Sequence, residues 1–138
     1  MKLMIMDGQG GGIGSTIIKG LRETLGHNIE ILALGTNSIA TSRMMKSGAN
    51  RGATGENTIV RTSMFVDVII GPLAIIMANS MLGEVTAKMA SAVSSSSAKK
   101  ILLPLNQENV QVIGVSGEPL PHLVNKVVNI IREMTQYV

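Results

Sequence analysis

The chain has 138 residues, 45% of them hydrophobic, and a formal net charge of +3. This length can bury one good core but is too short for two domains of ordinary size, so we expect a single domain over residues 1–138. The absence of cysteine excludes disulfides, thiol catalysis and zinc–thiolate sites. The apolar run before Asp7 is far too short for a secretory signal, which predicts a cytoplasmic protein.

Neither nucleic acid nor a membrane is an expected partner. The 12 Lys and Arg residues are scattered and there is no Trp, whereas nucleic-acid surfaces combine a basic face with stacking aromatics. The longest apolar stretch, 65–83, is broken by Asp67, Gly71-Pro72 and Asn79-Ser80, whereas a membrane-spanning helix needs about 20 mostly apolar residues. The high apolar fraction and the 10 methionines, which adapt well to contact surfaces, predict a homodimer or higher homo-oligomer.

Strands and helices are expected to alternate along the first half of the chain, as judged from apolar runs and helical spacing. In chain order, these elements are a strand at 2–6, a helix at 15–25, a strand at 29–34, a helix at 38–45 and a helix at 57–64. Residues 49–57 are polar and contain glycine without a hydrophobic period, which predicts a loop.

The second half continues this alternation and then departs from it. In chain order, its elements are a strand at 66–70, a helix at 80–93 capped by Ser80, strands at 100–105 and 110–115, and a last helix opened by Pro119 and Pro121. Only residues 106–109 separate the last two strands, and a parallel crossover needs a dozen or more residues. The fifth strand should therefore return antiparallel.

These elements predict an α/β fold. We expect a three-layer, Rossmann-like sandwich with a mostly parallel five-stranded sheet and an antiparallel edge strand. In order of appearance, the strand order is 3-2-1-4-5 or 2-1-3-4-5, and the sequence leaves both open.

A glycine-rich loop joins the first strand to the first helix. Residues 7–14 read Asp7, Gly8, Gln9, Gly10, Gly11, Gly12, Ile13, Gly14. Such a loop brings backbone N–H groups and the positive end of a helix against an anion, which predicts a phosphate site formed by all of these residues except Gln9. The alternative is a βα turn that needs glycine only for packing.

The spacing of Gly8, Gly12 and Gly14 resembles the cofactor loop of short-chain dehydrogenases. Those enzymes use a Tyr-x-x-x-Lys pair, and the only tyrosine here, Tyr137, is one residue from the end. The resemblance therefore implies binding of a dinucleotide but not that chemistry.

The end of the second strand indicates which ligand is expected. A dinucleotide site usually has an acidic residue there for the ribose hydroxyls, and this chain has Gly35, Thr36 and Asn37 instead. With no carboxylate to repel it, a 2′-phosphate can be met by Thr36, Asn37, Ser38 and Arg43. The pattern therefore favours NADP, or another phosphorylated ligand, over NAD.

Asp7 has two interpretations. It can accept hydrogen bonds from the loop amides and hold the turn, or it can share a divalent metal with the phosphate. One carboxylate alone makes a poor metal site, so we expect the first role and no metal.

Other polar residues are expected at the same edge of the sheet, because ligands of open α/β sheets bind outside the carboxyl ends of the strands. Thr36, Asn37 and Asn106 follow strands, and Asn79 and Arg51 stand on loops able to close over them. Arg51 is the best candidate for an anion clamp, since a guanidinium matches phosphate with a fork of donors, and the alternative is a solvated loop arginine. Glu56 and Glu84 each have three possible roles: proton transfer, metal binding, or an acid in the first turn of a helix, where the helix dipole favours it.

Five segments together resemble a family of short bacterial proteins known as domain-of-unknown-function family 3842. They are Asp-Gly-Gln-Gly-Gly-Gly-Ile-Gly at 7–14, Ala-Leu-Gly-Thr-Asn at 33–37, Gly-Ala-Asn-Arg-Gly-Ala-Thr-Gly-Glu-Asn at 48–57, Asn-Ser-Met-Leu-Gly-Glu at 79–84 and Lys-Lys-Ile-Leu-Leu-Pro-Leu-Asn at 99–106. The resemblance implies a cytoplasmic single-domain protein and carries no activity with it.

Three functions remain open from the sequence. The first is a nucleotide- or dinucleotide-binding protein that senses or regulates without doing chemistry. The second is a small enzyme for a phosphorylated substrate, its site completed by Arg51, Glu56, Asn79 and Glu84. The third is a structural oligomer subunit whose glycine loop binds nothing. The missing catalytic pair favours the first.

Overall fold

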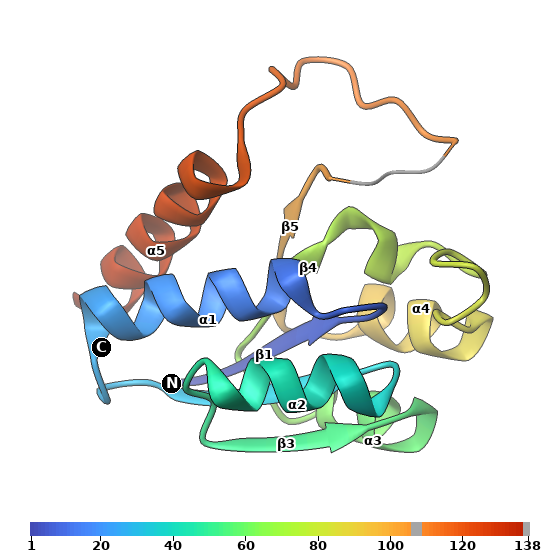
Figure 1. Cartoon of the computed structure of the whole chain (residues 1–138), viewed down its shortest axis with the longest axis horizontal. Helices are drawn as coiled ribbons and strands as arrows, with labels where there is room; N and C mark the ends of the chain where they lie inside the picture. Colours follow the sequence, from blue (N-terminus) through green and yellow to red (C-terminus); the bar gives the residue numbers. More distant parts are fainter. Residues whose placement is uncertain (106–108, 137–138) are drawn as a thin grey trace.

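A single all-parallel sheet organises the computed structural model, which describes residues 1–105 and 109–136. The strand order in this part of the chain is β3-β2-β1-β4-β5 (Figure 1). The strands are β1 (Lys2–Asp7), β2 (Glu30–Gly35), β3 (Arg51–Thr54), β4 (Val68–Pro72) and β5 (Lys99–Leu103). The helices are α1 (Gly12–Leu25), α2 (Ser38–Lys46), α3 (Glu56–Thr62), the 3-10 helix η1 (Leu73–Ile76), α4 (Ala87–Ser95) and α5 (Leu120–Gln136).

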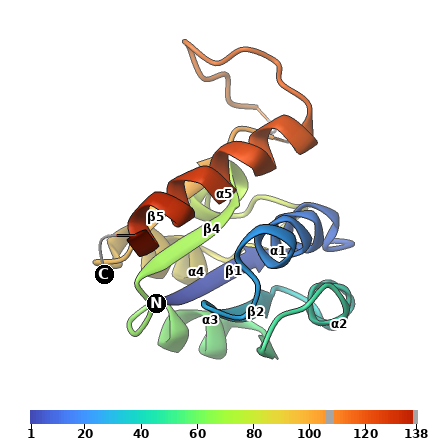
Figure 2. The same cartoon turned by 90° about the vertical axis from the view of Figure 1, so that its left-hand side faces the viewer.

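The central strand β1 is buried on both faces, as its continuous apolar run predicts. Leu3 and Ile5 belong to the core cluster beneath α1, α2 and α5, whereas Met4 and Met6 belong to the cluster formed with η1, α3 and α4. Figures 1 and 2 show these two groups of helices on opposite faces of the sheet. The predicted three-layer α/β architecture is therefore present.

The chain reverses its direction of travel across the sheet after β3. It moves outward from β1 through β2 to β3, then returns to pair β4 with the other side of β1. Ligands of open α/β folds bind at this reversal, outside the carboxyl ends of the strands. In this chain the glycine loop and the segment after η1 lie there.

The predicted antiparallel edge strand is wrong, because every strand pair in the described residues is parallel. Residues 110–115 form no strand and are exposed, and Figures 1 and 2 show residues 109–119, the connection that leads into α5, standing away from the body. Pro104 follows directly on β5 and has no backbone N–H for a ladder. Alternating apolar residues alone therefore did not make a strand here.

One edge strand was missed. Residues 51–54 were expected in a loop but form β3, which pairs with β2. The four strands predicted correctly follow the order 2-1-3-4 of the second alternative, and β3 adds outside β2. The residues Arg-Gly-Ala-Thr show no alternation because this short strand is largely exposed, so pairing with β2 decides its conformation.

The helix predicted from Ser80 begins later. Residues Ala87–Ser95 form α4, and Thr86 caps it by accepting a hydrogen bond from the Met89 N–H at 3.1 Å. The backbone φ is positive at Asn79, Met81, Leu82 and Gly83, which is incompatible with a right-handed helix. Ser80 instead donates its hydroxyl to the Ala74 carbonyl at 2.6 Å.

Candidate functional site

Asp7 closes the glycine loop from beneath. Its side chain is 3% exposed, and its two oxygens accept hydrogen bonds from the Gly8 N–H at 2.8 Å and the Gly14 N–H at 2.7 Å. The structure thus confirms the predicted role of Asp7 in holding the turn. Burial raises the pKa of its carboxyl, and backbone hydrogen bonds from Gly14, Gly8 and Ile13 oppose that rise.

Three of the five loop glycines are required by the protein's own structure. Gly11 has φ +72°, and an added methyl group would lie 2.8 Å from the Ala40 backbone. The same methyl group on Gly8 would lie 2.5 Å from Thr36 Oγ1, and on Gly14 it would lie 2.5 Å from Met44 Sδ. These contacts are too short, so the packing explains the glycines at these positions.

The other two glycines have no such explanation. A methyl group on Gly10 would come no nearer than 3.9 Å to a neighbouring atom, and on Gly12 no nearer than 3.4 Å. In both cases that atom is Nη1 of Arg43, and neither glycine has a positive φ. Packing and backbone geometry therefore tolerate alanine at both positions.

Glu84 reaches the glycine loop from the segment before α4. Its Oε1 accepts hydrogen bonds from the Gln9 N–H at 2.8 Å, from Thr36 Oγ1 at 2.7 Å and from Asn37 Nδ2 at 2.8 Å. On the right of Figure 1, the yellow-green segment before α4 faces the blue turn between β1 and α1. The structure thus brings Thr36 and Asn37 to the loop, as predicted, together with Glu84, one of the two acids considered for an enzyme site.

The environment of Glu84 favours the ionised form. Partial burial opposes ionisation, but the hydrogen bonds from Gln9, Thr36 and Asn37 together hold the pKa of this carboxyl below its usual value. A carboxylate therefore stands at the end of β2. The preference for NADP assumed that none was there, so the structure removes that premise.

Arg43 is the cation at the glycine loop. It projects from α2, and its Nη1 lies 3.4 Å from the Gly10 carbonyl oxygen. A shallow hollow of about 560 Å³ adjoins it, lined by Ser38, Ile39, Ser42, Arg43 and Lys46. The signal was present in the sequence, since Arg43 follows Asn37 by six residues, less than two helical turns.

The expectation that Arg51 faces the glycine loop is wrong. Arg51 begins β3, level with Leu32, so it lies toward the amino ends of the parallel strands. Its Nη2 forms an ion pair at 2.7 Å with Oε1 of Glu30, the first residue of β2. The error followed from the missed strand, because a residue at the start of a parallel strand lies opposite the carboxyl edge.

The remaining predicted residues do not complete a site with Arg51. The Asn79 side chain is exposed and makes no hydrogen bond to the glycine loop within the described part of the chain, and Asn106 lies outside that part. Glu56 accepts a hydrogen bond from Thr86 Oγ1 at 2.6 Å, which ties α3 to the cap of α4. Of the proposed enzyme set, only Glu84 contacts the loop.

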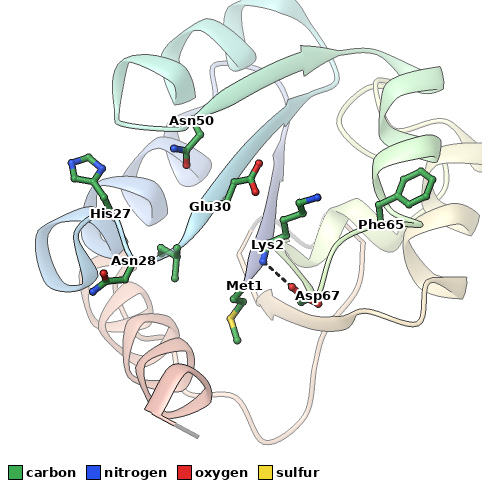
Figure 3. Close-up of a pocket in the computed structure, with 9 residues that line it drawn as sticks. Met1, Lys2, His27, Asn28, Glu30, Asn50, Phe65 and Asp67 are labelled. Atoms are coloured by element: carbon green, nitrogen blue, oxygen red, sulfur yellow. Dashed lines mark hydrogen bonds between the residues drawn. The ribbon is translucent and has the colours of Figure 1, made fainter. Parts of the chain in front are cut away.

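A second hollow, of about 590 Å³, lies at the opposite edge of the sheet (Figure 3). Its lining residues are Met1, Lys2, His27, Asn28, Ile29, Glu30, Asn50, Phe65 and Asp67. Lys2 there stands among the acids Glu30 and Asp67, and its backbone N–H donates to Asp67 Oδ2 at 2.7 Å. The mixed charges favour neither an anion nor a cation, so this hollow is a weaker candidate than the loop.

The chemistry available at the loop is recognition of an anion. Backbone N–H groups, the N-terminus of α1 and a guanidinium converge there. Within residues 1–105 and 109–136, no three His, Asp or Glu side chains are grouped so as to hold a metal ion. None of the helices described is long and apolar enough to span a membrane.

These features define a doubly wound α/β protein with a glycine-rich loop where its strand order reverses. The family model described as "Domain of unknown function (DUF3842)" matches residues 2–136, and the chain belongs to that family, as the sequence motifs predicted.

One similar solved structure is the "dodecameric FMN-dependent Ubix-like Decarboxylase" from Escherichia coli O157:H7. The two chains are 18% identical with a TM-score of 0.49, and the alignment covers 98% of this chain and 76% of the other. Curated protein sequences gave no significant match.

Proposed function

We propose that the protein binds a phosphate-bearing ligand of nucleotide or dinucleotide type at the glycine loop. The phosphate lies against Gly10 and Gly12, between the N-terminus of α1 and the guanidinium of Arg43. The observation that carries this proposal is that the fold itself does not need glycine at these two positions. A ligand that approaches the backbone closely does need it.

The electrostatics support an anion at this position. The N-terminal turn of α1 presents partial positive charge, and Arg43 adds a full charge on the outer side of the loop. The carboxylate of Asp7 is beneath the loop, where the amides of Gly8 and Gly14 already satisfy it. Its repulsion of a phosphate is therefore reduced.

The role we infer is sensing or regulation by binding, and not catalysis. The sequence lacks the Tyr-x-x-x-Lys pair of the dehydrogenases whose loop it resembles. The acids and the arginine considered for an enzyme lie apart, with Arg51 at the far edge of the sheet and Glu56 bound to Thr86.

The competing interpretation is that the glycine loop is purely structural and binds no ligand, and one observation favours it. Gly8, Gly11 and Gly14 are explained by packing or by positive φ, and Asp7 and Glu84 already accept hydrogen bonds from three loop amides. Gly10 and Gly12 are therefore the positions that distinguish a phosphate-binding loop from a purely structural one.

The test is calorimetric titration of NAD, NADP, ATP, GTP, FMN and coenzyme A, with and without magnesium, into the wild type and two variants. We expect at least one of these ligands to bind the wild type, and Gly10→Ala and Gly12→Ala to lose that binding while their melting temperatures stay unchanged. Loss of binding with intact folding is the result that a structural loop does not predict. No binding by the wild type, or undiminished binding by both variants, would contradict the proposal.

We also propose that the protein forms a homodimer or higher homo-oligomer. Ile113, in the connection that stands away from the body, is 87% exposed, and three valines near it, Val110, Val112 and Val115, are also exposed. Apolar residues this exposed on one segment support burial against a second copy of the chain.

A further inference from the structure

Glu84 places a carboxylate at the end of β2, where the residues that follow the strand in sequence include no acid. Dinucleotide-binding folds use an Asp or Glu at the end of the second strand to bind the ribose hydroxyls. Here Thr36 and Asn37 follow β2, and both donate hydrogen bonds to Oε1 of Glu84, a residue 48 and 47 positions further along the chain. The third donor to the same oxygen is the Gln9 N–H of the glycine loop.

The carboxylate is held in a fixed position. Its segment is anchored on either side by Ser80, which is 1% exposed and donates to the Ala74 carbonyl, and by Val85, which is fully buried. Three donors then orient Oε1. A carboxylate has two oxygens with about four acceptor positions, and in the described part of the chain Oε2 makes no hydrogen bond.

We propose that Glu84 binds the 2′- and 3′-hydroxyls of a ribose and sets the specificity of the site, selecting a free ribose over one with a 2′-phosphate. This inference rests on the proposed function and names its ligand class as a nucleotide or dinucleotide without a 2′-phosphate. The hydroxyls donate to the carboxylate, whereas a 2′-phosphate brings a second anion against it. NAD is then preferred over NADP, the reverse of the preference that the sequence alone indicates.

The test compares NAD with NADP, and ADP with 2′-deoxy-ADP, on the wild type and Glu84→Gln. Glutamine keeps an amide oxygen for the three donors and replaces Oε2 with an NH2 group, so the fold is retained. We expect the wild type to bind NAD about 10-fold or more tighter than NADP, and ADP about 10-fold or more tighter than 2′-deoxy-ADP. Glu84→Gln should lose most of both preferences.

Glu23→Gln is the matched control, because Glu23 is exposed on α1 outside the site and its substitution makes the same change in net charge. We expect it to keep both preferences. Glu84→Ala is the second variant, and it should lose both preferences as Glu84→Gln does.

Three outcomes overturn the inference. The wild type could bind NADP as tightly as NAD, Glu84→Gln could retain the wild-type preferences, or Glu84→Gln could bind NAD more tightly, which would mean that the carboxylate competes with the ligand. In these cases a nucleotide still binds and the proposed function stands. If no nucleotide binds the wild type or Glu84→Gln, the proposed function fails, and this inference fails with it.

Discussion

Asn37 Nδ2 donates a hydrogen bond of 2.8 Å to Oε1 of Glu84, while Oδ1 of the same side chain accepts one of 2.9 Å from the Ala40 N–H. The second bond caps α2, and the first ties that cap to the segment before α4. A third bond, from Nδ2 to the Gln9 carbonyl at 2.9 Å, adds the glycine loop. Asn37 therefore joins the three parts of the site.

Asn37→Asp should be destabilising although aspartate is as good a helix cap as asparagine. The substitution places a carboxylate oxygen against Oε1 of Glu84 and the Gln9 carbonyl, in place of a donor. We expect a loss of about 1–3 kcal/mol in the free energy of unfolding at pH 7, measured by urea denaturation. Asn37→Ser, which keeps a cap without the like charge, should lose less. Equal stability of Asn37→Asp and the wild type would show that Asn37 acts only as a cap.

Arg43→Ala and Arg51→Ala remove the same charge from opposite edges of the sheet. Arg43 lies beside Gly10, so its removal should weaken nucleotide binding by about 1.5–3 kcal/mol, the range for a hydrogen bond to a charged group.

Arg51 is in an exposed ion pair with Glu30, so its removal should leave binding unchanged and cost at most about 1 kcal/mol of stability. Calorimetric titration on both variants checks this pair of predictions. If Arg51→Ala alone weakened binding, the ligand would lie at the amino ends of the strands, and the proposed site at the glycine loop would be contradicted.

The placement of Arg51 shows which elements had a local signal in the sequence and which had none. Strong local signals predicted the β1, glycine loop and α1 unit and the hydrogen bonds of Asp7 to the loop amides, because an apolar run, glycines and helical spacing act within a few residues. The strand at Arg51–Thr54 has no such signal, since it is short, exposed and formed by pairing with β2. One missed edge strand then reversed the predicted position of Arg51.

Glu84 was named as a candidate site residue, but its contacts at the end of β2 could not be predicted, for a different reason. It depends on a segment whose backbone has positive φ at four of the residues between 79 and 83, three of which are not glycine. The apolar spacing of Met81, Val85 and Met89 predicted a helix there, and burial of Met81 and Val85 does occur, but from a loop. Periodicity reports which residues are buried more reliably than it reports the backbone that buries them.

Asp7 should give the protein a distinct pH dependence. Burial raises the pKa of Asp7 above its ordinary value of 3.8, so the folded state binds this proton more tightly than the unfolded state. The contribution of this group to the free energy of unfolding therefore falls as the pH rises from about 3.8 through the folded pKa, and stays lower above it.

The asparagine of Asp7→Asn does not titrate, so this variant lacks the fall in the free energy of unfolding that Asp7 causes as the pH rises. We expect the stability of Asp7→Asn relative to the wild type to increase with pH between about pH 3 and pH 7, as measured by denaturant unfolding at each pH. A difference that is flat or decreases over this range would mean that the loop amides, and not burial, dominate the carboxyl.

Self-association should depend on the exposed connection before α5. Ile113→Ser should shift sedimentation toward the monomer without lowering the melting temperature, because Ile113 is 87% exposed and contributes little to the core. Leu82→Ser is the control, since Leu82 is 98% exposed on a different segment and should leave association unchanged. A wild type that sediments as a monomer at micromolar concentration would contradict the proposal.

The most direct measurement of the central claim is an NMR titration of the uniformly 15N-labelled wild type with ADP. Binding of the phosphates at the glycine loop predicts that the largest shift changes fall on the backbone amides of Gly10, Gly11 and Gly12, with a further change at the Arg43 Nε–H. The absence of shift changes at millimolar ADP, or changes grouped around Lys2 and Asn50 at the opposite edge of the sheet, would contradict it.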